Sequence, residues 1–71
     1  MELKKEVGKR LATARKQAGF TQKEAGGSIL MSQPNYARFE QGYYELSYSQ
    51  IVTLCKLFDC SADYLLGLAE I

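Results

Sequence analysis

Apolar residues recur every three or four positions over residues 2–18, with polar and basic residues between them. Stepping about 100° per residue gathers the apolar side chains into an arc of about 80°, which is the pattern of an amphipathic helix. Gly19 then suits the left-handed position that ends a helix. The pattern predicts a first helix over residues 2–18 whose inner stripe consists of Leu3, Val7, Leu11, Ala14 and Ala18.

A second helix is predicted to begin at Gln22. Thr21 is followed at the third position by Glu24, which is the spacing of a capping box. In this motif the hydroxyl accepts a hydrogen bond from a first-turn N–H, and the carboxylate accepts one from the N–H of the capping residue. The helix should run to about residue 29, and the apolar residues 29–31 then form a junction.

A third helix is predicted to begin at Gln33. Ser32 is a second cap, and Pro34 is tolerated because the N–H groups of a first turn have no intrahelical partner. Gly42 fits a left-handed position and ends the helix after roughly nine residues. Residues 21–42 therefore form one motif of two short helices and a tight turn.

The third helix has two unlike faces. Tyr36, Phe39 and Glu40 fall within an arc of about 100°, so this side should pack inward and carry one carboxylate with it. The opposite side offers small, amide and guanidinium groups, and such groups can read base edges in a major groove. This outer side consists of Gln33, Pro34, Ala37, Arg38 and Gln41.

Two more helices are predicted in the C-terminal third. Ser47 and Gln50 form another capping box before a helix over about residues 48–58, and Ser61 caps a last helix that ends at Gly67. The chain of 71 residues is thus expected to be all-α, a compact five-helix bundle forming one domain over residues 1–71. The final LAEI is apolar enough for a dimer contact or for a fragment of a truncated tail.

Composition excludes several kinds of site. The chain has no His, and Cys55 and Cys60 have no second pair, so we expect two reduced packing residues and neither a metal site nor a disulfide. No cofactor is implied. The N-terminus has no apolar signal region, and no apolar run reaches about 18 residues. A cytoplasmic protein with no membrane span is expected.

The charges are unevenly distributed along the chain. Residues 1–38 contain eight of the nine Lys and Arg and have a net charge of +5, whereas residues 39–71 have a net charge of −4. The basic half of the chain contains the motif, which is the arrangement expected of a nucleic-acid-binding protein. An ordinary solvated first helix beside an acidic tail explains the asymmetry as well. Arg10 and Arg15 lie at the two edges of the first apolar stripe, and the periodicity alone does not decide which of them turns toward Glu40.

The motif resembles the phage-repressor-like helix-turn-helix family, of the Cro/repressor or Xre type. The resemblance covers about residues 7–67 and implies a lambda-repressor-like fold and a sequence-specific DNA-binding transcriptional regulator, typically a repressor. The matching residues are Thr21, Gln22, Glu24, Ser32, Arg38, Phe39, Glu40 and Gly42, followed by Ser47, Leu54, Ser61 and residues 63–67.

The resemblance also implies structural roles. It assigns Arg15 as the partner of Glu40 in a partly buried ion pair, and it gives Gly26 the role of a small residue where two helices approach closely. The family usually has glycine at the position of Leu30, and we expect the turn to differ slightly here rather than to strain Leu30. Gly27 has no evident role.

In the docking geometry of this family, the second helix of the motif lies in the major groove. Gln33 is then the leading reader because its amide can pair with adenine; Arg38 can reach guanine or a phosphate, and Asn35 a phosphate or a base edge. Pro34 and Ala37 can only pack on a thymine methyl group. Ser32 is also counted in the interface, Gln22 is expected to bind a phosphate, and Tyr43 and Tyr44 either contact the backbone or simply pack.

The expected partner is double-stranded DNA, bound by a homodimer on a two-fold operator whose half-sites lie about one helical turn apart. The alternative is a protein-interaction module on the same scaffold, such as an antitoxin or adaptor, which the Tyr-Tyr loop and the apolar end favour. An enzyme is not expected, because the chain has no His, no paired carboxylates in an apolar setting and no Gly-rich phosphate loop.

Overall fold

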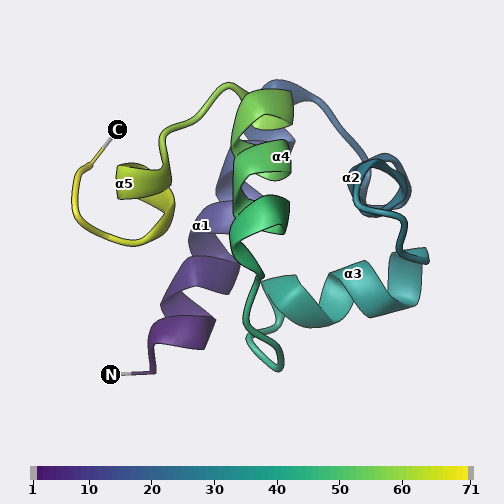
Figure 1. Cartoon of the computed structure of the whole chain (residues 1–71), viewed down its shortest axis with the longest axis horizontal. Coiled ribbons are helices and arrows are strands. Elements are labelled where there is room, and N and C mark those ends of the chain that lie inside the picture. The colour runs from purple at the N-terminus through teal and green to yellow at the C-terminus, as the bar shows by residue number, and fades with distance from the viewer. Residues whose placement is uncertain (1, 71) are drawn as a thin grey trace.

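The computed structural model describes residues 2–70, and Met1 and Ile71 lie outside the described part, so the prediction for the LAEI end is addressed only up to Glu70. Within this part the chain is all-helical, as predicted (Figure 1). The helices are α1 (Leu3–Ala18), α2 (Gln22–Ser28), α3 (Gln33–Glu40), α4 (Tyr48–Phe58) and α5 (Ala62–Leu65). The predicted starts of the second to fifth helices coincide with the observed ones, and the first differs by one residue.

The helices pack around α1. In Figure 1, α1 and α4 stand beside one another, α3 lies across their lower end, and α2 and α5 flank them on opposite sides. Contacts between helices agree with this view, since α1 touches α3, α4 and α5, while α2 touches α3 and α4. The motif helices are therefore held by both of the longer helices.

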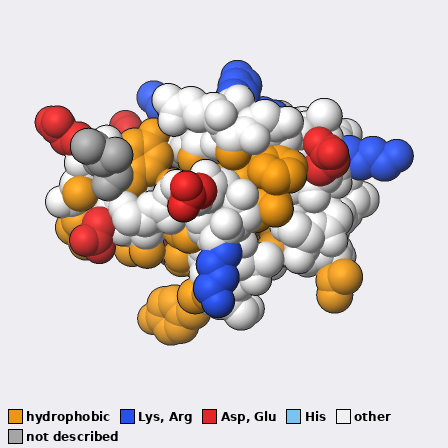
Figure 2. All heavy atoms as spheres, turned by 90° about the horizontal axis from the view of Figure 1, so that it is seen from above, with side chains coloured by type: hydrophobic (Ala, Val, Ile, Leu, Met, Phe, Trp, Pro, Cys, Tyr) orange, Lys and Arg blue, Asp and Glu red, His pale blue; other side chains and the backbone are white. Residues whose placement is uncertain are grey.

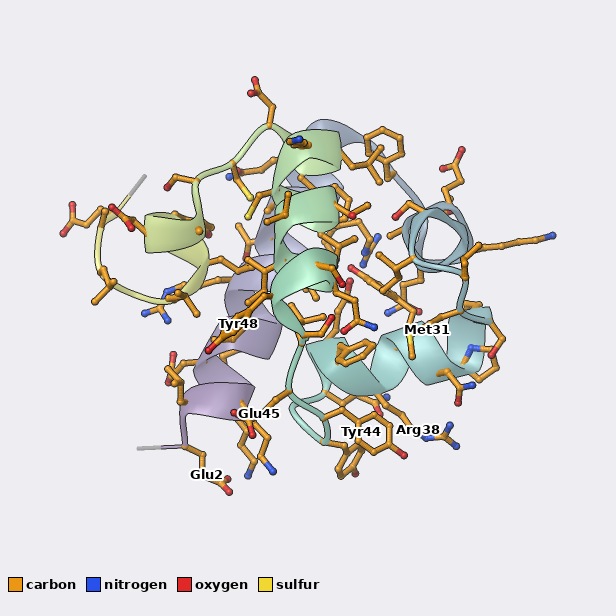
Figure 3. All side chains as sticks on the ribbon, in the orientation of Figure 1. Glu2, Met31, Arg38, Tyr44, Glu45 and Tyr48 are labelled. Carbon is orange, nitrogen blue, oxygen red and sulfur yellow. The ribbon has the colours of Figure 1, made fainter. Side chains whose placement is uncertain are left out.

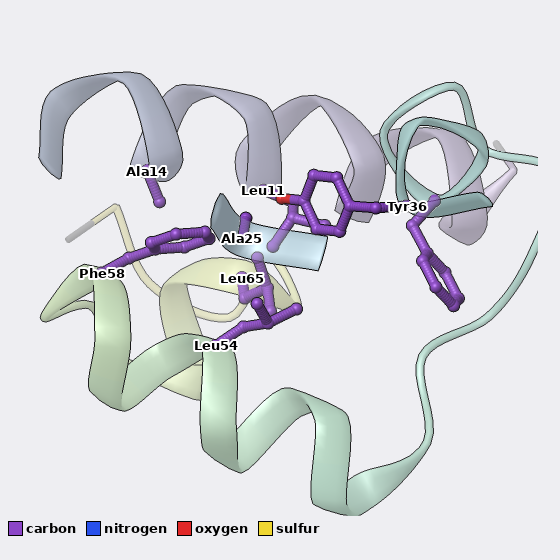
Figure 4. Close-up of a cluster of buried hydrophobic side chains, with 8 residues drawn as sticks. Leu11, Ala14, Ala25, Tyr36, Leu54, Phe58 and Leu65 are labelled. Carbon is purple, nitrogen blue, oxygen red and sulfur yellow. The ribbon is translucent and has the colours of Figure 1, made fainter. Parts of the chain in front are cut away.

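One cluster of buried side chains joins all five helices (Figure 4). Tyr36 reaches from α3 toward Leu11 of α1, and Phe58 of α4 lies beside Ala14. The predicted inner stripe of α1 is correct only in its middle, because Leu3 and Ala18 are exposed where the neighbouring helices no longer cover α1. The buried cluster consists of Leu11, Ala14, Ala25, Tyr36, Phe39, Leu54, Phe58 and Leu65.

Each helix is followed by a residue in the left-handed conformation. Glycine occupies this position after α1, α3 and α5, where it costs little because glycine has no Cβ. Asp59 takes it after α4, with φ of 54°, and Leu30 takes it after α2, with φ of 60°. The expectation that the turn would avoid positive φ at Leu30 is therefore wrong.

Two of the predicted caps are complete capping boxes. Thr21 with Glu24 and Ser47 with Gln50 make both reciprocal hydrogen bonds. Ser32 precedes α3 as expected, but its hydroxyl makes no capping bond, which corrects that prediction. Pro34 has no N–H, so the N–H of Asn35 is the one donor left for a capping hydroxyl, and it makes no bond to Ser32.

The two cysteines are free thiols, each half-buried. Cys60 follows the end of α4, where its N–H donates to the carbonyl oxygen of Cys55 at 3.0 Å. Burial raises the pKa of the Cys60 thiol to about 11, with a further contribution from the neighbouring Cys55. A thiol with a raised pKa is a poor nucleophile, which suits a packing role for Cys60, and both cysteines pack against the buried cluster.

Candidate nucleic-acid interface

The two faces of α3 separate as the sequence pattern predicts. Tyr36 is fully buried and Phe39 is 4% exposed, so the aromatic side of the helix is anchored in the core. On the other side Gln33, Asn35 and Arg38 are exposed. Pro34 and Gln41 are also exposed, and Ala37 is half-buried. The outer face of α3 thus consists of polar groups with only small apolar groups between them.

The turn before α3 brings α2 and α3 very close together. The N–H of Met31 donates to the carbonyl oxygen of Gly26 at 2.8 Å, which closes the end of α2. A Cβ at Gly26 would lie 3.0 Å from both the Met31 oxygen and the Cβ of Tyr36. Gly26 therefore has the packing role that the resemblance implies, whereas the corresponding Cβ at Gly27 would meet nothing within 4 Å.

The other end of α3 is held just as closely by α1. Gly8 is buried against α3, and a Cβ there would lie 2.5 Å from the backbone oxygen of Glu40 and 2.6 Å from that of Phe39. Backbone oxygens cannot move aside as a flexible side chain can. Only glycine at this position lets the two helices approach so closely.

The Arg15–Glu40 ion pair is present and lies between α1 and α3. The Nε atom of Arg15 donates to Glu40 Oε2 at 2.6 Å, and its Nη2 atom donates to Glu40 Oε1 at 3.2 Å. The two side chains are only 10% and 7% exposed. Nη1 of Arg15 also donates to the backbone oxygen of Phe20 at 2.9 Å. The guanidinium group thus holds both α3 and the segment after α1, whereas Arg10 has no such role.

The pair perturbs the ionisation of three groups. Burial by itself would raise the pKa of Glu40, but hydrogen bonds from Arg15 and Gln22 outweigh burial and hold this pKa below its ordinary value. The hydrogen bond to Glu40 in turn raises the pKa of Arg15. Burial raises the pKa of the nearby Tyr36 phenol, whose buried oxygen makes no hydrogen bond of regular geometry to the described residues.

A chain of side-chain amides runs from this pair to the surface. Nε2 of Gln22 donates to Glu40 Oε1 at 3.0 Å, and Nε2 of Gln33 donates to Gln22 Oε1 at 2.7 Å. The exposed amide of Gln33 is therefore oriented through Gln22 by a buried ion pair. The sequence pattern did not predict this chain, because Gln22 and Gln33 belong to different helices.

Arg38 and Asn35 form a second oriented pair on the outer face. Nη1 of Arg38 donates to Asn35 Oδ1 at 2.6 Å, across three residues of the same helix. Positions three apart on a helix are neighbours, so the spacing alone could have predicted this contact. The pairing limits the rotation of the guanidinium group and leaves its remaining N–H groups for an external partner.

Residues 43–47 follow α3 and continue the same surface. Figure 3 shows Tyr44 and Arg38 at the lower edge of the molecule, where Glu2 of the segment before α1 also lies. The Tyr44 ring packs at a steep angle against Phe39, with ring centroids 6.0 Å apart, and remains half-exposed. Tyr43 is more exposed. Tyr44 is thus partly a packing residue, and Tyr43 has the more exposed side chain of the two.

The face away from α3 has a different character. Figure 2 views the molecule from above the orientation of Figure 1, and basic and acidic side chains stand singly there without gathering into a patch of one sign. Among residues 2–70, no three potential ligand side chains lie close enough together to hold a metal ion. No described helix is both long and apolar enough to cross a membrane.

Comparison with known proteins agrees with this geometry. A family model described as "Helix-turn-helix" matches residues 11–65, which include α2, α3 and the turn between them. The chain belongs to the helix-turn-helix family. Within this family α2 and α3 are the two helices of the motif, and the matched residues also include the second half of α1 and all of α4 and α5.

A curated relative supports the same assignment. The chain is 38% identical over 65 residues to the HTH-type transcriptional regulator ImmR of Bacillus subtilis (strain 168). The aligned region covers 92% of this helix-turn-helix chain but 51% of the relative. The chain therefore spans about half the length of the curated relative that it matches.

Proposed function

We propose that this chain is a sequence-specific DNA-binding transcriptional regulator that acts as a repressor by occupying its operator in the cytoplasm. The observation that carries the proposal is the anchoring of α3 by Tyr36 and Phe39, which leaves the amide and guanidinium groups of its other face exposed. In a helix-turn-helix protein the second helix of the motif enters the major groove with its N-terminal residues at the base edges.

Gln33 is the proposed base reader. An adenine offers N7 as an acceptor and its N6 amino group as a donor, which a side-chain amide can bind together. One N–H of Gln33 is engaged by Gln22, while its second N–H and its oxygen remain for adenine. Gln33 can therefore keep its bond to Gln22 and still make both bonds to the base.

The other outer residues supply contacts around Gln33. Arg38, oriented by Asn35, reaches a guanine or a phosphate, and Asn35 keeps its amide N–H groups for a phosphate or a base edge. Pro34 and Ala37 pack on thymine methyl groups. The Ser32 hydroxyl and the Gln22 amide lie at the starts of α3 and α2, where phosphate contacts are favourable, and the Tyr43 and Tyr44 hydroxyls bind the DNA backbone.

Selection of bound sequences from a random duplex library tests the proposal. We expect one preferred sequence for the wild-type chain, and Gln33→Ala should lose about 1–3 kcal/mol and relax the preference at one base position. Gln17→Ala is the matched control, because this exposed glutamine lies on α1 away from α3. A wild-type chain that enriches no duplex contradicts DNA binding, and an unchanged preference in Gln33→Ala contradicts the reader assignment.

We also propose a homodimer whose contact is an apolar groove beside the DNA-facing side. The groove of about 370 Å³ lies between the start of α1, residues 44–48, α4 and α5, and Tyr48 at its edge is 91% exposed. Lys4 and Glu45 both line it, so two copies related by a two-fold axis can pair opposite charges. Leu3, Tyr48 and Val52 at this groove are exposed apolar side chains that a second copy would cover.

Sedimentation equilibrium tests this dimer. The wild-type chain should show a concentration-dependent monomer–dimer equilibrium, and Tyr48→Ser should shift it toward the monomer. Leu30→Ser is the matched control, because Leu30 is also almost fully exposed but lies in the turn of the motif, outside the groove. Equal association of the two variants contradicts this groove as the dimer contact.

A further inference from the structure

The first turn of α1 lies directly against the residue that ends α3. Gly42 has φ of 87°, and a Cβ built there would lie 2.7 Å from Cγ and 2.8 Å from Cα of Lys5. The side-chain stem of Lys5 therefore crosses the C-terminal end of α3. Lys5, Gly8 and Arg15 all contact the end of α3, so they belong to one side of α1. The sequence pattern by itself indicates no such role for Lys5.

The segment that continues the outer surface beyond α3 has no positive charge of its own. Residues 43–47 contain Tyr43, Tyr44 and Glu45 but neither Lys nor Arg. A helix that lies in a major groove has a phosphate backbone on each side, and cations near phosphates supply a large share of the binding free energy of such interfaces. A basic residue that binds the DNA strand beside this end of α3 must therefore come from a part of the chain other than residues 43–47.

Lys5 is the cation that the fold places there, and its present partner is easily replaced. Its ammonium group pairs with Glu2 at 3.1 Å, and both side chains are 64% exposed. An ion pair this exposed contributes little and is readily exchanged. Glu2 lies at the same lower edge of the molecule as Tyr44 and Arg38 (Figure 3). Through its ion pair with Glu2, the Lys5 ammonium group lies at the edge of the molecule that also carries Arg38.

We propose that Lys5 is a DNA-backbone contact: when α3 enters the groove, its ammonium group exchanges the Glu2 carboxylate for a phosphate of the strand beside the C-terminal end of α3. The inference rests on the proposed DNA binding and assigns the contact to α1, outside the two motif helices. Lys5 positions the domain without reading sequence, because a phosphate carries no base identity. Glu2 acts as an internal competitor for the ammonium group.

The salt dependence of binding tests Lys5. Lys5→Met keeps a stem of similar length over Gly42 and removes the charge, and Lys16→Met removes the same charge from the exposed last turn of α1. With the duplex of highest affinity from the library selection, Lys5→Met should weaken binding about 3-fold to 10-fold and reduce the slope of log K against log salt by about 0.9. Lys16→Met should change neither, and both variants should unfold at the wild-type temperature.

Equal slopes for the two variants would overturn the inference while leaving the proposed DNA binding intact. A loss of thermal stability in Lys5→Met with an unchanged slope would overturn it as well, because Lys5 would then only stabilise the end of α3 through the helix dipole. If the wild-type chain binds no duplex, the proposed function itself fails. The three results are distinguishable because the wild-type chain is measured in the same titrations.

A second variant tests the exchange of partners. Glu2→Gln removes the competing carboxylate and should tighten binding to the same duplex, and this gain should largely disappear when Lys5→Met is also present. A gain of equal size in both backgrounds would mean that Glu2 acts only by general repulsion of DNA, which would overturn the exchange. No gain in either background would overturn it too.

Discussion

The two ends of α3 are attached to the rest of the molecule in contrasting ways. At the C-terminal end, Gly8 leaves no space between backbones, and the Arg15–Glu40 ion pair is nearly buried. At the N-terminal end, α3 is entered through a turn in which the exposed side chain of Leu30 occupies a left-handed position that favours glycine. Both ends are closely packed, but only the turn at the N-terminal end contains a residue in an unfavourable backbone conformation.

Contacts from both ends of α3 position Gln33, the proposed base-reading residue. Gln33 lies near the strained turn, yet its amide is oriented through Gln22 from the ion pair at the opposite end of α3. The turn therefore only connects α2 to the start of α3 and does not itself orient the Gln33 amide. Orientation of the outer face then depends on the contacts with α1, and substitutions at the two ends should have effects of different size and sign.

The largest expected effect is that of Arg15→Ala. It leaves the Glu40 carboxylate in a mostly buried site without its cation and removes the bond to the Phe20 carbonyl oxygen. The free energy of unfolding should fall by about 2–4 kcal/mol in chemical denaturation. The double replacement Arg15→Met with Glu40→Leu should lose less, because no unpaired charge remains. A melting temperature equal to that of the wild type would show that the pair has no structural role.

Gly8→Ala comes next in size. The added methyl group would meet two backbone oxygens of α3, so α1 and α3 must separate, and stability should fall by about 1–3 kcal/mol. Gly27→Ala is the control, since its Cβ would meet open space and alanine is the better helix former. Thermal unfolding of both variants should give shifts of opposite sign. A neutral Gly8→Ala would mean that the two helices can move apart at no cost.

Leu30→Gly should act in the stabilising direction. Glycine adopts the observed φ of 60° without the clash that a leucine Cβ creates, and the exposed side chain gives up almost no packing. The free energy of unfolding, measured with urea, should rise by about 1 kcal/mol. The greater flexibility that glycine gives the unfolded chain offsets part of this gain. A loss of stability would indicate that the Leu30 side chain makes a stabilising contact, and the contrast between the two ends would then disappear.

The smallest effect concerns acid pH. Because the pKa of Glu40 is lowered by folding, its contribution to stability is fully present above the ordinary pKa of a glutamate and is lost as the pH falls through the lowered value. The melting temperature should therefore be level near neutral pH and decline in acid. Glu40→Gln should flatten that decline more than Glu24→Gln, although the pKa of Glu24 in its exposed capping box is lowered too. Equal flattening would mean that the buried pair does not determine the acid response.

Much of the fold followed from local patterns in the sequence. The capping boxes at Thr21 and Ser47 set the starts of α2 and α4, and the glycines after α1, α3 and α5 set their ends, because these signals act between residues close together in the chain. The inward side of α3 followed from its periodicity. The partner of Glu40 did not, since two arginines flanked the stripe and only the family resemblance favoured Arg15.

Apart from the Arg15–Glu40 pair and the close approach at Gly26, contacts between separate helices were decided by the tertiary structure alone. Nothing in the spacing of Gln22 and Gln33 indicates that their amides meet, or that Lys5 crosses Gly42. The left-handed conformation of Leu30 was likewise mispredicted, because leucine disfavours it and only the packing of α2 on α3 requires it. Capping and periodicity are local and can be predicted from the sequence, whereas the distance and angle between helices depend on how all of their faces pack at once.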